Sequence, residues 1–234
     1  MRMRFLGKLS RRSRIVDYFR KYIKAKFPKH FYFPSYSQWG EDALISQFIP
    51  GNKGFYVDVG SGHPIEGNNT YFLYRRGFSG VLVDPIKQNI EQARKWRPRD
   101  SAVHSLVGQD SKSVTFYEFE NYGISTTQVE RVNLLQNSGF VLANSYKVMR
   151  KTLTYILEEN LVPKTFDLLS CDVEGEELNV LKSLDFEKYK PKLICVEELA
   201  LSPFKDTQLR SFLYSVNYEP VISAWNSHIF LLKS

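Results

Sequence analysis

The chain has little of what several classes of protein depend on. It contains only two cysteines, Cys171 and Cys195, which excludes a disulfide-stapled scaffold and cannot alone complete a four-ligand zinc site. No apolar run approaches the ~18 residues that cross a bilayer, so the sequence predicts no membrane-spanning helix. With 43% hydrophobic and 24% charged residues, the composition is typical of a folded domain rather than a disordered chain.

The excess of positive charge lies at one end of the chain. Residues 1–30 contain eleven Lys and Arg residues and one acid, Asp17, whereas the remainder contains 21 basic and 24 acidic residues. The net charge of +7 therefore belongs to the N-terminal segment. Because a nucleic-acid-binding domain needs a basic surface of its own, we expect no nucleic-acid partner.

The basic segment also carries apolar residues at helical spacing. Ile15, Phe19, Ile23 and Phe27 recur near that spacing, and Pro28 ends the pattern. This predicts a basic amphipathic N-terminal helical extension over residues 1–34, ahead of a domain over residues 35–234. Such a helix can lie on an anionic membrane surface through residues 5–27, or it can dock on the body or on a partner. Two lone thiols suit a reducing compartment, so we expect a cytoplasmic protein, with peripheral membrane contact as one of these interpretations.

Strand and helix patterns alternate along the body. The expected strands are 54–59, 80–84, 102–107, 113–119, 146–152, 166–172, 192–197, 218–223 and 228–232. The expected helices are 38–48, 69–76, 87–96, 153–160, 176–183 and 206–215, with a polar stretch at 121–128. Near-continuous apolar strands joined by helices predict an α/β fold with a doubly wound, mostly parallel sheet. Ligands of such a sheet bind beyond the carboxyl ends of its strands, so these ends hold the candidate site residues.

A glycine-containing turn follows the first buried strand. Asp58 lies in that strand, and Gly60, Ser61 and Gly62 follow it. Glycines there permit positive φ and a close approach of a ligand to the backbone. Asp84 ends the second strand, where a carboxylate can accept both ribose hydroxyls of a nucleoside cofactor. The alternative is a structural turn with a capping acid.

The residues after this turn discriminate between nucleoside cofactors. A dinucleotide fingerprint needs Gly or Ala at the position of Ile65, and Pro64 removes an N–H group that a pyrophosphate would use. A nicotinamide-dependent oxidoreductase is therefore the less favoured alternative. S-adenosylmethionine has no phosphate: its ammonium suits Asp58, and its carboxylate suits backbone N–H groups at 60–62. Asp110 is placed to accept from the adenine amino group, although it equally suits a turn.

The candidates for catalysis follow the strand at 166–172. If the sheet is doubly wound, this strand adjoins the first one, so Asp172 and Glu174 face the pocket and can accept a proton. Acids there can instead stabilise the start of the next helix. A divalent cation held by Asp172 with Glu174 or Glu197 is an alternative that we do not favour, so no metal ligand is assigned. His63 is the reserve base.

Five segments resemble, in order and spacing, the FkbM family of S-adenosylmethionine-dependent methyltransferases. They are YSQWGED at 36–42, GFYVDVGSGHP at 54–64, NTY at 69–71, GFSGVLVDP at 77–85 and DVEGEE at 172–177. The resemblance covers about residues 36–232. It implies a Rossmann-like class I methyltransferase fold with a seven-stranded, mostly parallel sheet. It also implies S-adenosyl-L-methionine as cofactor and O-methylation of a hydroxyl, as in polysaccharide biosynthesis.

The resemblance further implies which residues form the cofactor site. Asp58, Gly60 and Gly62 correspond to the methionine end of the cofactor, and Asp84 corresponds to its ribose. The other residues that we expect in or beside this site are Gln38, Glu41, Ser61, Asn69, Thr70 and Pro85.

These observations predict in-line transfer of a methyl group to a hydroxyl of a sugar, a glycan or glycolipid, or a secondary metabolite. The expected partner is a small-molecule, sugar or lipid-linked glycan substrate; the oligomeric state is not predicted. The rival from another class is a non-catalytic, membrane-associated binding protein with a degenerate methyltransferase fold. The acids at 58, 84 and 172 are intact, which argues against decay of the site.

Overall fold

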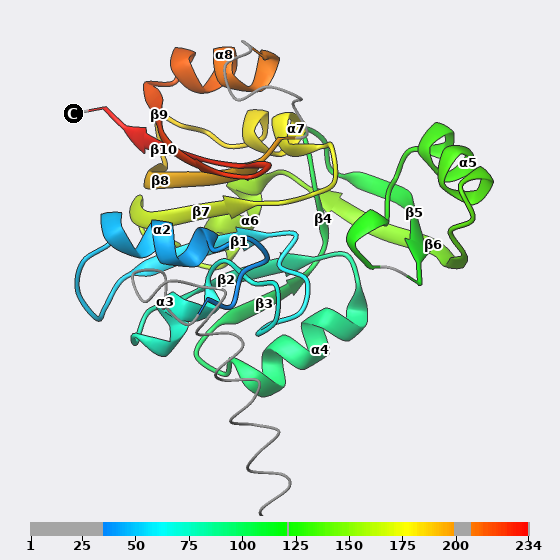
Figure 1. Cartoon of the computed structure of the whole chain (residues 1–234), viewed down its shortest axis with the longest axis horizontal. Helices are drawn as coiled ribbons and strands as arrows, with labels where there is room; N and C mark the ends of the chain where they lie inside the picture. The colour runs from blue at the N-terminus through cyan, green and yellow to red at the C-terminus, as the bar shows by residue number, and fades with distance from the viewer. Residues whose placement is uncertain (1–34, 121, 199–206, 234) are drawn as a thin grey trace, which may run out of the picture. The chain divides into compact units, whose positions relative to one another are not determined.

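A central seven-stranded sheet organises the part of the chain that the computed structural model describes, residues 35–120, 122–198 and 207–233 (Figure 1). The expected basic helix and its membrane contact at 5–27 lie outside these residues. The boundary between residues 1–34 and 35–234 therefore stays a prediction. Within the described residues, no helix combines the length and the apolar character needed to cross a bilayer.

The strand order confirms the doubly wound topology. Its strands are β1 (Phe55–Val59), β2 (Ser79–Asp84), β3 (Ser101–His104), β7 (Thr165–Cys171), β8 (Lys190–Glu197), β9 (Tyr218–Ala224) and β10 (Ser227–Leu232). They lie in the order β3-β2-β1-β7-β8-β10-β9. β1 pairs in parallel with both β2 and β7, whereas β10 is antiparallel to β8 and β9. The chain thus winds one way from β1 to β3 and the other way from β7, which makes the gap between β1 and β7 the switch point.

Helices cover both faces of this sheet because the central strands are apolar on both faces. The helices of the described residues are α2 (Glu41–Phe48), α3 (Tyr71–Arg75), α4 (Lys87–Trp96), α5 (Val129–Asn137), α6 (Leu153–Glu159), α7 (Glu177–Lys182) and α8 (Gln208–Ser215). Val57 of β1 packs in one core cluster with residues of α6, α7 and α8. The preceding residue, Tyr56, packs in a second cluster with residues of α2, α3 and α4. This alternation explains why β1 reads as a continuous apolar run.

A second, three-stranded sheet was not expected. Its strands are β4 (Leu106–Val107), β5 (Lys112–Phe119) and β6 (Leu142–Lys151), in the order β4-β6-β5. Figure 1 shows it beyond the carboxyl edge of the main sheet, with α5 farther out. The predicted strand at 102–107 is in fact divided between the two sheets at Ser105. The buried Ser105 hydroxyl bonds to the carbonyl groups of Leu106 and Met149, at 2.7 and 2.9 Å, which moves the chain into the second sheet.

Candidate active site

A cavity of about 550 Å³ opens at the carboxyl edge of the main sheet, at the switch point and beside the ends of β1, β2 and β7. The aliphatic and aromatic residues of its lining are Val59, Val83, Ile86, Leu106, Val107, Phe116 and Val173. The acids in its lining are Glu66, Asp84, Asp172, Glu174 and Glu176. No Lys or Arg of the described residues lines it. The cavity therefore suits an apolar ring and a cationic group, and no Lys or Arg of the described residues is placed there to bind a phosphate.

Gly60 allows the ends of β1 and β7 to meet. Its φ is +74°, and a Cβ atom there would lie 1.7 Å from the carbonyl oxygen of Asp172. The Asp172 N–H donates to the carbonyl of Val59 at 3.0 Å, which continues the strand pairing to this point. A side chain at position 60 would force the two strand ends apart, so this position requires glycine.

Asp84 presents a buried carboxylate to the cavity from the end of β2. It accepts the backbone N–H groups of Gly62 and Ile86, both at 2.8 Å, and the side-chain amide of Asn89 at 3.1 Å. Burial raises the pKa of Asp84 to about 6, and these hydrogen bonds oppose that rise. Among the described residues, only Gly62 donates to Oδ2, so this oxygen keeps a lone pair for a ligand hydroxyl.

The backbone amides at 60–62 are already used inside the protein. Gly60 and Ser61 both donate to the carbonyl of Val83, at 2.9 and 3.2 Å, and Gly62 donates to Asp84. That these amides also bind the carboxylate of a cofactor stays a prediction. Their role here is to fix the turn between the first two strands.

The structure divides the expected site residues into two groups. Those that line the cavity are Gln38, Gly60, Ser61, Gly62, His63, Asp84, Pro85, Asp172 and Glu174. Those that do not are Glu41, Asp58, Asn69, Thr70 and Asp110. Asn69 instead donates to the Ser170 hydroxyl at 3.3 Å. Asp110 is 44% exposed and pairs with Lys112 at 2.7 Å and with Arg150, so salt bridges rather than a nucleobase engage it here.

Asp58 supports the cavity from behind. Its carboxylate is 3% exposed and accepts from the hydroxyl of Thr70 at 2.7 Å and from the amide of Asn68 at 3.1 Å. The same Asn68 amide donates to the carbonyl of Ser61 at 2.9 Å. Burial raises the pKa of Asp58, and Arg97 opposes this. Asp58 and Thr70 thus hold the loop that carries Ser61.

Arg97 is a buried cation that sequence reasoning missed. Its Nε donates to Asp100 at 2.7 Å, and its two terminal nitrogens donate to Tyr56 at 2.7 Å, Thr70 at 2.9 Å and Asn68 at 3.0 Å. The side chains of Arg97 and Asp100 are both fully buried. A basic residue at the end of a polar helix is expected to be exposed to solvent. Nothing in the sequence therefore distinguishes Arg97 from the basic residues beside it. It anchors the end of α4 to the loop behind the cavity.

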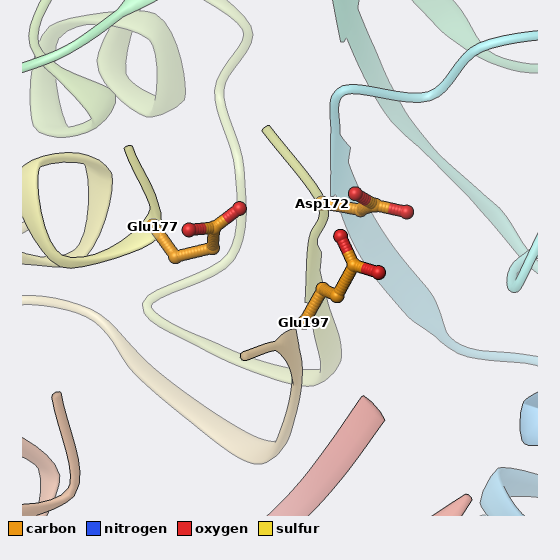
Figure 2. Close-up of side chains that lie close together, drawn as sticks. All are labelled: Asp172, Glu177 and Glu197. Atoms are coloured by element: carbon orange, nitrogen blue, oxygen red, sulfur yellow. The ribbon is translucent and has the colours of Figure 1, made fainter. Parts of the chain in front are cut away.

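Three carboxyl groups meet beside the cavity (Figure 2). Oxygen atoms of Asp172, Glu177 and Glu197 all lie within 4.8 Å of one another. Burial, followed by the charge of the neighbouring Glu197, raises the pKa of Asp172 well above its usual range. The cluster therefore favours uptake of a proton by Asp172.

Glu177 and Glu174 have structural partners within the same loop. Glu177 accepts the N–H groups of Val173 and Gly175, both at 3.0 Å. Glu174 has a φ of +58° and forms a 2.9 Å ion pair with Arg131 of α5. Burial and Glu197 raise the pKa of Glu174 to about 7, and Arg131 opposes this. Glu174 is thus paired with a residue of α5, a helix that the sequence did not predict. This leaves Asp172 as the better placed candidate for the base.

His63 is exposed, and its ring is used by its own loop. Nδ1 accepts the N–H groups of Ile65 and Glu66, at 3.3 and 3.0 Å. A neutral imidazole that accepts at Nδ1 carries its proton on Nε2. Neither ring nitrogen is then free to accept another proton, which argues against His63 as a general base.

Sequence reasoning also missed the amide side chains of α4. Gln88, Asn89 and Gln92 all line the cavity, and their spacing on a helix that follows Asp84 is a signal that could have found them. Gln92 Oε1 is buried and has no hydrogen-bond donor among the described residues. An amino group of a ligand would satisfy it. Together with the apolar residues of the lining, this fits an adenine-bearing cofactor.

The chain matches a known protein family. Residues 58–220 match the family model described as the Methyltransferase FkbM domain. No curated protein matches the chain.

Solved structures similar to this chain include a TehB-like SAM-dependent methyltransferase from Corynebacterium glutamicum, with 12% identity, 96% of this chain and 99% of that chain covered, and a TM-score of 0.44. Another is the O-methyltransferase from Bacillus cereus in complex with SAH, with 12% identity, 94% and 91% coverage, and a TM-score of 0.42. These scores carry no argument about the site. The domain match spans well over half of the sequence, and the chain belongs to the FkbM methyltransferase family.

Proposed function

We propose that this protein transfers the methyl group of S-adenosyl-L-methionine to a hydroxyl of a sugar, either free or within a glycan or a lipid-linked glycan. The observation that carries the proposal is the cavity at the switch point, which joins the Asp84 carboxylate to an acidic lining without Lys or Arg. S-adenosylmethionine carries a ribose and a positive sulfonium but no phosphate. That combination matches this lining, whereas a pyrophosphate does not.

We assign the main parts of the cofactor to residues of the lining. Asp84 Oδ2 accepts from the ribose, and the apolar side chains of Ile86, Leu106 and Phe116 pack on the adenine. The free acceptor of Gln92 receives an amino group. Gln38, which carries both a donor and an acceptor, faces the polar end of the cofactor. Asp58, in contrast, acts through the loop that it holds.

Asp172 is the proposed general base. The acceptor oxygen attacks the methyl carbon in line with the carbon–sulfur bond, which breaks to leave a neutral thioether. The hydroxyl proton passes to a carboxylate, because an alcohol is a poor nucleophile while it is protonated. Burial and the charge of Glu197 raise the pKa of Asp172, so its carboxylate takes up a proton more readily than an ordinary one does.

The two alternatives raised from the sequence are less well supported. Membership of a methyltransferase family argues against a nicotinamide-dependent oxidoreductase, as do Pro64 and Ile65. A degenerate, non-catalytic binding protein would not need to keep the acids of the cavity. A lipid-linked acceptor would agree with peripheral membrane contact through residues 5–27, and we propose a cytoplasmic location for the reaction.

Isotope transfer tests the proposal. The full-length protein is incubated with methyl-labelled S-adenosylmethionine and with methyl glycosides, nucleotide sugars and short glycans, and products are read by mass. We expect a gain of one methyl group on an oxygen of a sugar. Failure to bind S-adenosylmethionine or S-adenosylhomocysteine in calorimetry would overturn the cofactor assignment. Transfer to nitrogen or carbon acceptors alone would overturn the assignment of the acceptor.

A further inference from the structure

Two exposed indoles lie against each other at the carboxyl edge of the main sheet. Trp39 precedes α2 and Trp225 lies between β9 and β10, and they are 58% and 72% exposed. Their ring centroids are 5.6 Å apart, and their planes are inclined by 30°. Exposed tryptophans of this size are costly to leave in water, and a contiguous apolar surface of this kind marks a binding site. The cavity chemistry proposed above does not use either of them.

The backbone holds Trp225 in a conformation that disfavours it. Ala224 pairs with Ser227, so Trp225 is the first residue of a two-residue hairpin loop, and its φ is +53°. Glycine is preferred where a hairpin loop needs positive φ at this position, because a side chain crowds the backbone there. A large side chain that persists in a strained conformation points to a function of that side chain.

One buried carboxylate ties the two indole-bearing segments together. Glu41 is 3% exposed; its Oε2 accepts the backbone N–H of Trp39 at 2.8 Å, and its Oε1 accepts the hydroxyl of Ser227 at 3.0 Å. This is the role that the structure shows for Glu41, which was expected beside the cofactor. Because the bonds fix both segments, the pair is preorganised rather than a chance contact of mobile side chains.

The pair borders the proposed reaction site. Trp39 follows Gln38, which lines the cavity. On the other side, Ser227 pairs with Glu197, a member of the cluster of three carboxyl groups, and the carbonyl of Asn226 accepts the N–H of Glu198 at 2.8 Å. In Figure 1 the turn between β9 and β10 lies at the same edge of the sheet as the ends of β7 and β8. A substrate held on the indoles can therefore extend toward the cavity.

We propose that Trp39 and Trp225 form a stacking platform for a pyranose ring of the acceptor glycan. The ring faces of a pyranose present C–H groups, which pack favourably on the electron-rich face of an indole. Asn226, which follows Trp225 in the chain, offers an amide donor and acceptor for the hydroxyls at the ring edge. The proposal rests on the proposed function, since it names the acceptor as a saccharide and locates a ring other than the one that is methylated.

Oligosaccharide binding tests the platform, and the third tryptophan provides a matched control. Trp96 is also exposed, at 53%, but it ends α4 and does not line the cavity. Wild-type protein with S-adenosylhomocysteine is screened on an array of defined hexopyranose oligosaccharides, and the best binder is titrated. We expect Trp39→Ala and Trp225→Gly to weaken this binding by about tenfold or more, as loss of an aromatic anchor does. Trp96→Ala should bind as wild type does.

Trp225→Gly separates misfolding from loss of the platform. Glycine adopts the observed φ without strain, so this variant should unfold at the same temperature as wild type or higher. No oligosaccharide bound by wild type, or unchanged binding by both variants, would overturn the platform. If wild-type protein binds phosphatidylglycerol vesicles but no glycan, and both variants lose vesicle binding, the platform is overturned in favour of a site for a lipid surface. Affinity for S-adenosylhomocysteine is measured in every variant. If wild-type protein does not bind S-adenosylhomocysteine, the proposed function is contradicted. If it binds S-adenosylhomocysteine but no glycan, only the platform is contradicted.

Discussion

The backbone N–H of Gly62 donates to the Asp84 carboxylate at 2.8 Å, across 22 positions of the sequence. This bond joins the turn after β1 to the end of β2, and it holds Asp84 with one oxygen directed at the cavity. The same bond explains why Gly62, with a φ of +55°, turns its amide inward. The site is thus organised around a carboxylate that is bound by the protein before any ligand arrives.

Removal of the Asp84 carboxylate should weaken cofactor binding. We expect Asp84→Ala to lower the affinity for S-adenosylmethionine by about 10- to 100-fold, because a hydrogen bond to a charged group is worth ~1.5–3 kcal/mol. Isothermal calorimetry measures this loss. Asp110→Asn is the matched control: Asp110 does not line the cavity, so its affinity should remain that of wild type. An equal loss in both variants would contradict the assignment of the ribose to Asp84.

Cofactor affinity should also depend on pH through the same carboxylate. The pKa of Asp84 is raised to about 6, so the group is ionised above this pH and protonated below it. A protonated carboxyl is a poorer acceptor for ribose hydroxyls, and the affinity should therefore fall as the pH decreases through about 6. Calorimetry between pH 5 and 8 measures the curve. In Asp84→Asn the inflection near pH 6 should disappear; if it persists, another group causes it.

Substitution of Asp172 should separate catalysis from binding. With Asp172→Asn we expect methyl transfer to fall by ~10²–10⁴-fold, the usual value of a general base. Affinity for S-adenosylhomocysteine should stay close to that of wild type. Glu174→Gln should have a smaller effect on turnover, because Glu174 is engaged by Arg131. Retained turnover in Asp172→Asn would place the base elsewhere.

Chelation distinguishes a carboxylate base from a metal-assisted reaction. Asp172, Glu177 and Glu197 are oxygen ligands of the kind that Mg²⁺ and Ca²⁺ prefer. If Asp172 acts as a carboxylate base without a cation, turnover should be unchanged after treatment with EDTA. Loss of activity with EDTA and its recovery with added Mg²⁺ would instead assign this cluster to a cation that polarises the acceptor.

Loss of the Arg97 cation should destabilise the fold. Arg97→Met leaves the buried Asp100 carboxylate without the cation that it pairs with. We expect this to lower the free energy of unfolding by ~3–5 kcal/mol. Urea unfolding measures the change. Lys87→Met is the control: the ion pair of Lys87 with Glu91 spans 3.7 Å at the surface, so its loss should alter stability little. A similar effect of both substitutions would show that burial of Arg97 is not what matters.

Much of the main sheet could be predicted from local patterns. The apolar strands around Val57 and Leu169, the helix that starts at Lys87 and the carboxylate at the end of β2 all lie where the sequence indicates. The five segments that resemble the FkbM family point to the family that the domain match shows. Each of these features depends on residues close together in the chain, which periodicity and spacing register directly.

Tertiary contacts decided the remainder of the site. The division of the strand at Ser105 depends on a carbonyl of the distant β6, and the capture of Glu174 depends on Arg131 of a helix with a weak apolar pattern. The burial of Arg97 and of Asp58 depends on one hydrogen-bond network, in which both side chains contact Asn68 from separate segments of the chain. By itself the sequence determined the family, the alternation of strands and helices and the acid at position 84, because these follow from residues that are close together in the chain. Only the tertiary structure decided which of the acids face the cavity, because burial and hydrogen-bond partners arise between residues that the sequence keeps far apart.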